Sequence, residues 1–352
     1  MPRKSLYIIL LLVASVCAVA QPTHYEVEAT TGYLLPVNYD NYTPTNGLSV
    51  NVLWQQTGDE DWKRFWHQPF FGLHLGFAHL QHNIVGERLE AGCVVRSVIY
   101  KRLMLDYRLG LSFYTNPYSR SHNDENRYIG SYVNALLAAS VRYEWPLRSG
   151  ARIALGAGIV HSSSGYLSSP NLGLNYLQGD LGICLPSKAQ RQATMNVTDD
   201  AQDISDSFKV SVRPFISVAP GLVRSRNDDN PDSRKYYFAY TLQGGAIAHL
   251  HPCFSVGADA DMMYNYAHLT EVQSDDYHVY FGASVFGEGH WGPITLRASV
   301  GHYLDYYRLN REQIYLRGGA YYNITQRQRI GAAMKLHYGH IDYIEWTYMI
   351  EL

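Results

Sequence analysis

From residue 24 to the C-terminus, apolar and polar residues alternate with a period of two. In Thr295-Leu296-Arg297-Ala298-Ser299-Val300-Gly301, for example, Leu, Ala and Val alternate with Thr, Arg and Ser. Successive side chains of an extended strand point to opposite faces, so one face would lie in lipid or a core and the other in water. The pattern predicts sixteen strands, at 24–34, 46–55, 69–79, 88–100, 102–114, 129–145, 150–162, 171–185, 208–224, 234–249, 253–267, 277–290, 293–304, 312–324, 328–339 and 342–351. No long segment has the helical period of 3.6 residues.

The connections between these strands alternate in length. Short turns fall at Lys101, 146–149, His251-Pro252, Trp291-Gly292 and 325–327, and longer polar links at 115–128, 163–170, 225–233, 268–276 and 305–311. Transmembrane barrels have short periplasmic turns and long external loops, so this rhythm favours one. Two further links, 56–68 and 186–207, are long although their parity places them on the periplasmic side.

The composition agrees with a wall that has one face in lipid. Only 17% of the residues are charged, and 30 are tyrosine. No stretch reaches about 18 uninterrupted apolar residues, which excludes a helical membrane protein. We therefore expect an all-β fold, an antiparallel transmembrane β-barrel of 12–16 strands, as a single domain over residues 21–352. A secreted β-sandwich or propeller also alternates, but long strands with tyrosines at their ends favour the barrel.

The N-terminus indicates the compartment. Arg3 and Lys4 precede an apolar run from Leu6 to Val16, and Ala18-Val19-Ala20 forms a small-x-small cleavage site. Residues 1–20 are therefore predicted to be a secretory signal peptide, and the barrel is expected in a bacterial outer membrane. A lipoprotein processed at Cys17 is less favoured, because the preceding valine is bulky.

Charge and cysteines exclude two other classes. The chain has 29 basic and 31 acidic residues and a formal net charge of −2, so we expect no nucleic-acid partner. The three cysteines after residue 20 are an odd number, which predicts no disulfide framework. His249, His251 and Cys253 alternate across a predicted turn, but beside Pro252 they are more simply turn residues than metal ligands.

One segment carries a chemical pattern. It runs Gly158-Ile159-Val160-His161-Ser162-Ser163-Ser164 and continues, after the loop, into Pro170-Asn171-Leu172-Gly173-Leu174-Asn175. Two residues apart on a strand, His161 and Ser163 point to the same side, and a serine hydroxyl needs a base such as imidazole to become a nucleophile. By parity they continue the outward apolar face, and Asn171 and Asn175 share the outward parity of the next strand.

This segment resembles the signature of the outer-membrane lipid A 3-O-deacylase (PagL-like) family, in which His-x-Ser precedes a Pro-Asn-x-Gly element. The resemblance implies a β-barrel hydrolase that removes an ester-linked acyl chain from lipid A in the outer leaflet. It implies that His161 is the general base, Ser163 the nucleophile and Asn171 an oxyanion donor. The specific match covers residues 161–175. No cofactor or metal is required, and the oligomeric state stays open.

The chain departs from the family pattern in three respects. The family's acid, a glutamate, falls at Asn175, which can hold the imidazole tautomer but cannot stabilise imidazolium as a carboxylate would. Ser164 stands where the family usually has asparagine, and the family barrel has only eight strands. Asp180 has inward parity and is no substitute for the acid. A non-catalytic barrel, either a channel or a surface scaffold, is therefore the alternative.

Overall fold

The computed structural model describes residues 22–35, 43–81, 83–165, 167–188, 208–223, 235–266, 279–304, 313–337 and 340–352. Its strands are β1 (His24–Leu34), β2 (Thr43–Gln55), β3 (Phe70–His79), β4 (Glu87–Tyr100), β5 (Leu103–Tyr114), β6 (Val133–Pro146), β7 (Arg152–Ser163), β8 (Leu174–Pro186), β9 (Ser211–Val223), β10 (Tyr237–His251), β11 (Phe254–Asn265), β12 (Val279–Trp291), β13 (Ile294–Tyr303), β14 (Ile314–Asn323), β15 (Gln328–His337) and β16 (His340–Glu351). A short helix, α2 (Asp61–Phe65), lies between β2 and β3. Within these ranges no helix is long and apolar enough to cross a membrane. The predicted signal peptide lies outside the described residues.

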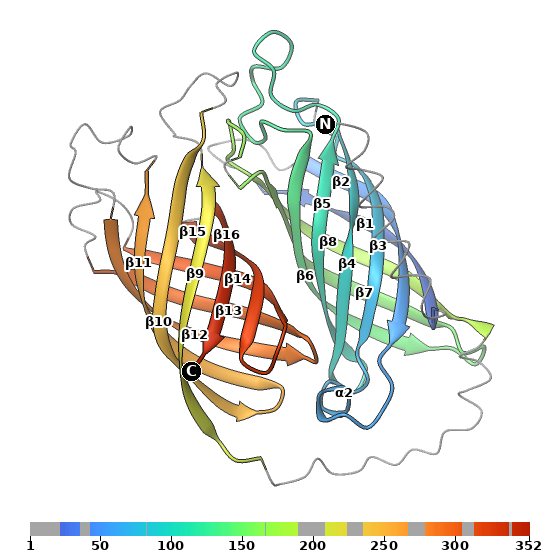
Figure 1. The fold of residues 1–352 in the computed structure, drawn as a ribbon. Coiled ribbons are helices and arrows are strands. Elements are labelled where there is room, and N and C mark those ends of the chain that lie inside the picture. Colours follow the sequence, from blue (N-terminus) through green and yellow to red (C-terminus); the bar gives the residue numbers. More distant parts are fainter. Residues whose placement is uncertain are drawn as a thin grey trace.

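The strands close into two antiparallel barrels of eight strands each (Figure 1). β8 pairs with β1 to close the first barrel, and β16 pairs with β9 to close the second. The all-β antiparallel fold is confirmed, and every predicted strand overlaps an observed one. The expected single barrel of 12–16 strands over 21–352 is wrong, because the eighth strand returns to the first. The long link after β8 is the boundary between the barrels.

Side chains fill the inside of the first barrel. Arg96 binds Glu26 at 2.7 Å and Asp106 at 2.7 Å, and Arg142 binds Glu26 at 2.6 Å. An eight-stranded barrel is just wide enough for side chains to fill it. Because these charges are buried, each depends on its partner.

The second barrel is filled in the same way. Glu288 binds Arg297 at 2.6 Å and Arg329 at 2.8 Å, and Arg317 binds Asp261 at 3.1 Å. The polar residues that alternate with apolar ones along the strands therefore face packed barrel interiors rather than an open channel.

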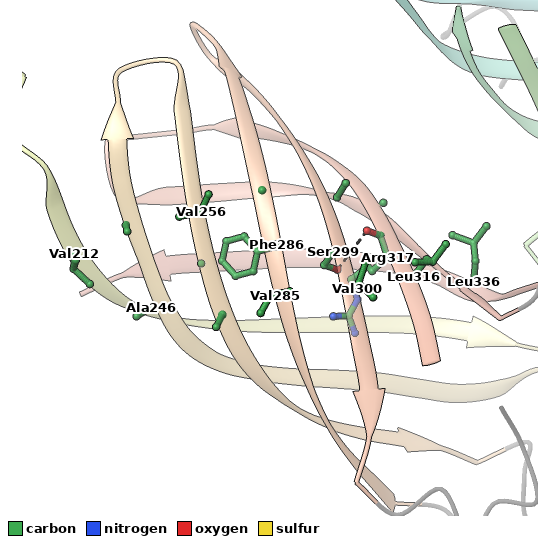
Figure 2. Close-up of a pocket in the computed structure, with 16 residues that line it drawn as sticks. Val212, Ala246, Val256, Val285, Phe286, Ser299, Val300, Leu316, Arg317 and Leu336 are labelled. Atoms are coloured by element: carbon green, nitrogen blue, oxygen red, sulfur yellow. Dashed lines mark hydrogen bonds between the residues drawn. The ribbon is translucent and has the colours of Figure 1, made fainter. Parts of the chain in front are cut away.

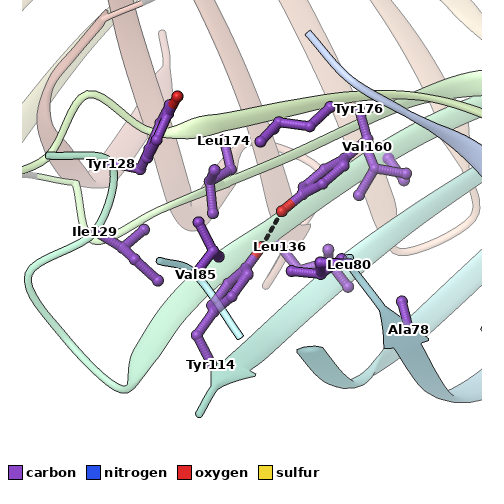
Figure 3. Close-up of a cluster of buried hydrophobic side chains, with 12 residues drawn as sticks. Ala78, Leu80, Val85, Tyr114, Tyr128, Ile129, Leu136, Val160, Leu174 and Tyr176 are labelled. Atoms are coloured by element: carbon purple, nitrogen blue, oxygen red, sulfur yellow. Dashed lines mark hydrogen bonds between the residues drawn. The ribbon is translucent and has the colours of Figure 1, made fainter. Parts of the chain in front are cut away.

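An apolar cluster closes one end of the first barrel (Figure 3). Leu80, Val85 and Ile129 come from loops, and they pack with Tyr114 and Tyr176 on the strands, whose hydroxyls lie 3.5 Å apart. Val160 of β7 and Leu174 of β8 belong to the same cluster. The ends of these two strands are therefore backed by a packed interior.

At the end of the barrels that carries α2, an aromatic contact joins them. The rings of Trp66 and Trp291 stack with centroids 4.4 Å apart. The Trp66 indole donates to the His290 carbonyl at 2.8 Å, and the Trp291 indole donates to Ser97 Oγ at 2.7 Å. The long 56–68 link, unexplained by the barrel rhythm, thus carries a contact between the two barrels.

Candidate functional site

The end of β7 places the predicted pair on the outer side of the first barrel. Ile153, Leu155 and Ile159 are exposed, whereas Ala154 and Val160 are buried. Residues 161 and 163 share the parity of the exposed set. In β8, Leu177 and Leu181 are exposed with the parity of Asn175. The alternation seen in the sequence therefore gave the correct face for both strands.

His161 and Asn175 are directly paired across β7 and β8. The imidazole Nδ1 lies 2.7 Å from Asn175 Oδ1. When the Nδ1–H donates to this oxygen, the imidazole presents an unprotonated Nε2. That nitrogen is buried and has no hydrogen-bond partner among the described residues. Asn175 thus orients the imidazole through Nδ1. It leaves Nε2, the base nitrogen that a serine hydrolase needs, without a competing partner among the described residues.

Ser163 follows on the same face but is covered. The residue is only 1% exposed, and its Oγ has no hydrogen-bond partner within the described ranges. In particular, Ser163 Oγ and His161 Nε2 do not form a hydrogen bond with each other. Such bonds are often long before substrate binds, so the arrangement is compatible with a nucleophile and its base.

Asn171 is held by the residue that follows the serine. Its Oδ1 accepts from the Ser164 backbone N–H at 2.8 Å and from the Ser164 hydroxyl at 2.9 Å. These two bonds fix the orientation of the side-chain amide. Its second polar atom, Nδ2, is buried without a partner in the described part of the chain. The departure at Ser164 therefore supplies an anchor for Asn171.

The loop after Ser163 folds back over the pair. Gly173 has a φ of +76°, and a Cβ placed on it would lie 3.1 Å from His161 Cε1 and 3.6 Å from Ser163 Cβ. The Gly173 N–H donates to the Tyr128 carbonyl at 2.9 Å, so the neighbouring long loop supports it. His161, Ser163 and Gly173 therefore meet at one place.

The three serines after His161 have different surroundings. Ser162 points inward, where Ser112 Oγ donates to it at 3.1 Å, and Ser164 anchors the loop as described above. Asp180 faces the interior, 4.0 Å from Arg142. It does not reach the outer face, as its parity predicted. Ser163 is thus the serine left for chemistry.

Buried polar atoms without partners are uncommon and call for an explanation. Each costs about 1–3 kcal/mol when it faces no partner. Here one segment holds a hydroxyl, an imidazole nitrogen and an amide N–H that all lack one. Those are the three groups that attack, accept a proton and stabilise an oxyanion in acyl transfer.

Two other features do not form comparable sites. No group of His, Cys, Asp and Glu in the described ranges is arranged to hold a metal. His249 instead contacts Ser255 and Glu351, and His251 accepts from the Cys253 N–H. A cavity on the second barrel has a volume of about 960 Å³ and is lined mainly by alanine, valine and leucine side chains; Figure 2 shows the lining residues. It holds no serine–histidine pair.

Comparisons with known proteins divide the chain at the same place as the fold. Residues 47–183 match the family described as Lipid A 3-O-deacylase (PagL). Residues 210–352 match the family described as Acyloxyacyl hydrolase, C-terminal domain. Each match falls on one barrel. No curated protein matches the chain.

Solved structures similar to the chain include mutants of the Rhodopseudomonas blastica porin. Two of them are 12% and 11% identical, with 94% of this chain and 99% of each porin covered, and TM-scores of 0.22 and 0.23. Scores this low carry no argument about this chain.

Proposed function

Because this chain belongs to the lipid A 3-O-deacylase (PagL) family and continues into that family's C-terminal acyloxyacyl hydrolase domain, we propose that it is an esterase in which Ser163 and His161 remove an acyl chain from lipid A. The family and the barrel fold place the protein in the bacterial outer membrane, and lipid A is the substrate class that the family implies. The serine–histidine chemistry and its position at the outer rim are our proposal.

The proposed reaction has two halves. Ser163 Oγ attacks the ester carbonyl of a lipid A acyl chain while His161 Nε2 takes the hydroxyl proton. Asn171 Nδ2 donates to the oxyanion of the tetrahedral intermediate. When the intermediate collapses, imidazolium returns the proton to the departing sugar oxygen. This step releases the under-acylated lipid A. Water then hydrolyses the acyl-serine with the same base, which releases the fatty acid.

The observation that carries the proposal is the set of partnerless atoms at the end of β7. Ser163 Oγ, His161 Nε2 and Asn171 Nδ2 are all buried and lack partners in the described part of the chain, while the opposite sides of the imidazole and the amide are bonded. The strand parity of His161 and Ser163 points away from the barrel interior, toward the side from which a membrane substrate arrives. A polar group near the interface costs only about 0–1 kcal/mol on that face.

Asn175 is the observation that favours the alternative of a non-catalytic barrel. It occupies the position of the family's glutamate and accepts from His161 without supplying a charge. Replacing a triad aspartate by asparagine can cost about four orders of magnitude in rate. A surface scaffold that has lost the acid would keep the same local geometry.

The deciding experiment expresses the full chain in a Gram-negative host and measures lipid A by mass spectrometry. We expect the loss of one acyl chain with the natural protein and its retention with Ser163→Ala. Ser162→Ala is the matched control, because that hydroxyl faces the interior. An unchanged lipid A, with the protein folded in the outer membrane, would refute the proposal.

A second substitution separates a slow enzyme from a scaffold. Asn175→Asp keeps the size of the side chain and gives His161 a carboxylate. We expect it to raise the deacylation rate severalfold or more over the natural protein, because a carboxylate stabilises imidazolium. A rate that appears only in this variant would identify the natural chain as the scaffold.

A further inference from the structure

The second barrel contacts the loop that follows the candidate nucleophile. Gly165 lies two residues beyond Ser163 and has a φ of +60°. A Cβ placed on it would lie 2.7 Å from Cγ1 and 2.9 Å from Cδ1 of Ile344, which is in β16. Because Gly165 has no side chain, the loop and the second barrel approach each other closely at this point.

A hydrogen bond accompanies the apolar contact. The hydroxyl of Tyr236, the residue immediately before β10, donates to the Leu167 carbonyl at 3.3 Å. Both contacts reach the segment that begins immediately after Ser163. The nucleophile loop is therefore attached to the second barrel at a methyl contact and at a polar one.

The opposite end of the barrels carries the aromatic contact of Trp66 and Trp291. Contacts at both ends fix how the two outer walls face each other. Ser163 has outward parity, and an outward side chain of a lone barrel would face lipid. It is nevertheless only 1% exposed. The loop that covers Ser163 is the same loop that contacts Ile344 and Tyr236, so the reacting groups lie beside a seam between the barrels.

We propose that the second barrel forms a wall of the lipid A site and that Ile344 positions the acyl ester against Ser163. This inference rests on the proposed function. The outward side chains that follow along β16 are Trp346 and Tyr348, both exposed. They continue an apolar surface from Ile344, which suits a hydrocarbon chain. The width left by Ile344 then decides which ester-linked chain reaches the serine.

The test measures which acyl chains are removed, in the full chain expressed in the outer membrane. Ile344→Trp narrows the seam, and we expect it to lower the rate about tenfold or more. Ile344→Ala widens the seam and is expected to add products cleaved at other ester positions. Val285→Ala is the control, because Val285 lies on β12, away from β16 in the second barrel, and is 63% exposed.

A change in the set of products is a readout that a merely structural role of Ile344 would not give. If the natural protein is active and Ser163→Ala abolishes activity, but both Ile344 variants behave like Val285→Ala, the inference is wrong and the proposed function stands. If lipid A is unchanged by the natural protein, the proposed function itself fails.

A second pair of variants covers the case in which Ile344→Trp does not fold. Gly165→Ala places a methyl group against Ile344, so we expect a clear loss of activity. Adding Ile344→Ala to it should restore part of the activity, whereas adding Val285→Ala should not. Equal behaviour of the two double variants would overturn the contact as a determinant of the reaction.

Discussion

Gly173 controls how closely the folded-back loop approaches His161. A side chain at this position meets the imidazole Cε1 at 3.1 Å, and the φ of +76° already disfavours any residue but glycine. The neighbouring backbone is held by Tyr128, so the imidazole rather than the loop has to move. Small displacements of a base from its nucleophile are costly, because reaction requires near-contact geometry.

We therefore predict that Gly173→Ala lowers deacylation by about tenfold or more. Quantitative mass spectrometry of lipid A measures this loss. Gly179→Ala in β8 is the matched control, since its Cβ would have no neighbour closer than 3.6 Å. Equal activity in the two variants would show that the imidazole is not confined by the loop.

The sequence predicted the strand residues of the site better than the loop residues. His161 and Asn175 face outward because side-chain direction in a strand follows local parity, and that can be read directly. The bonds from Ser164 to Asn171 could not be read, since they join residues across a folded loop. The missing bond between Ser163 and His161 also depends on that loop. The signal that was available was the glycine of the Pro-Asn-x-Gly element.

The link between β2 and β3 connects the two barrels. Its α2 helix is too short to form a layer, but Trp62 in the helix and Trp66 directly after it lie against the second barrel. Trp66 stacks on Trp291, and a Cβ on Gly292 would lie 2.9 Å from the Trp62 ring. A longer periplasmic link thus serves to join the barrels.

Cys253 lies near α2, so the reactivity of its thiol can test the contact between the barrels. It is buried in the turn before β11, and burial together with the nearby Asp61 carboxylate of α2 raises the pKa of its thiol to about 12. The folded state therefore favours the protonated thiol. The resulting stability is present at neutral pH and is lost as the pH rises above the ordinary thiol pKa toward 12.

We predict that Cys253 resists maleimide in the natural protein at pH 8 and reacts faster after Trp66→Ala. Removing the indole loosens α2, so the thiol becomes accessible and Asp61 moves away. Labelling is measured in detergent in a Cys93→Ser background, which removes the exposed cysteine. Trp145→Ala changes an exposed tryptophan of the first barrel and serves as the control. Unchanged labelling in Trp66→Ala would mean that the aromatic contact does not cover Cys253.

At the scale of the whole molecule, alternation predicts strands but not how many close together. Closure depends on which strand pairs with β1, and that partner, β8, lies far along the chain. The polar link from 186 to 207, which broke the rhythm of short turns, marked the boundary between two closed units. Family barrels of eight strands pointed to the same division. The long link and the eight-stranded family barrels were both available before the structure. Neither follows from the local alternation of apolar and polar residues.

The closed interiors determine what the molecule can transport. Arg96 and Arg142 fill the first barrel with their carboxylate partners, and the apolar loop cluster around Leu80 and Ile129 lies at one end. In the second barrel, Arg297 and Arg317 occupy the interior with theirs. Opening a path would separate buried ion pairs, and breaking one costs about 3–5 kcal/mol.

We accordingly predict that the purified full chain gives no conductance steps in a planar lipid bilayer. A sixteen-stranded porin measured in the same chamber is the positive comparison, because barrels of that size leave an aqueous channel. The two proteins differ in the number of strands that close together, since the described residues of this chain also form sixteen strands but divide them between two barrels. Reproducible steps from the natural chain would show that the ion-paired interiors open in a membrane. The buried ion pairs would then not be enough to keep the two interiors closed.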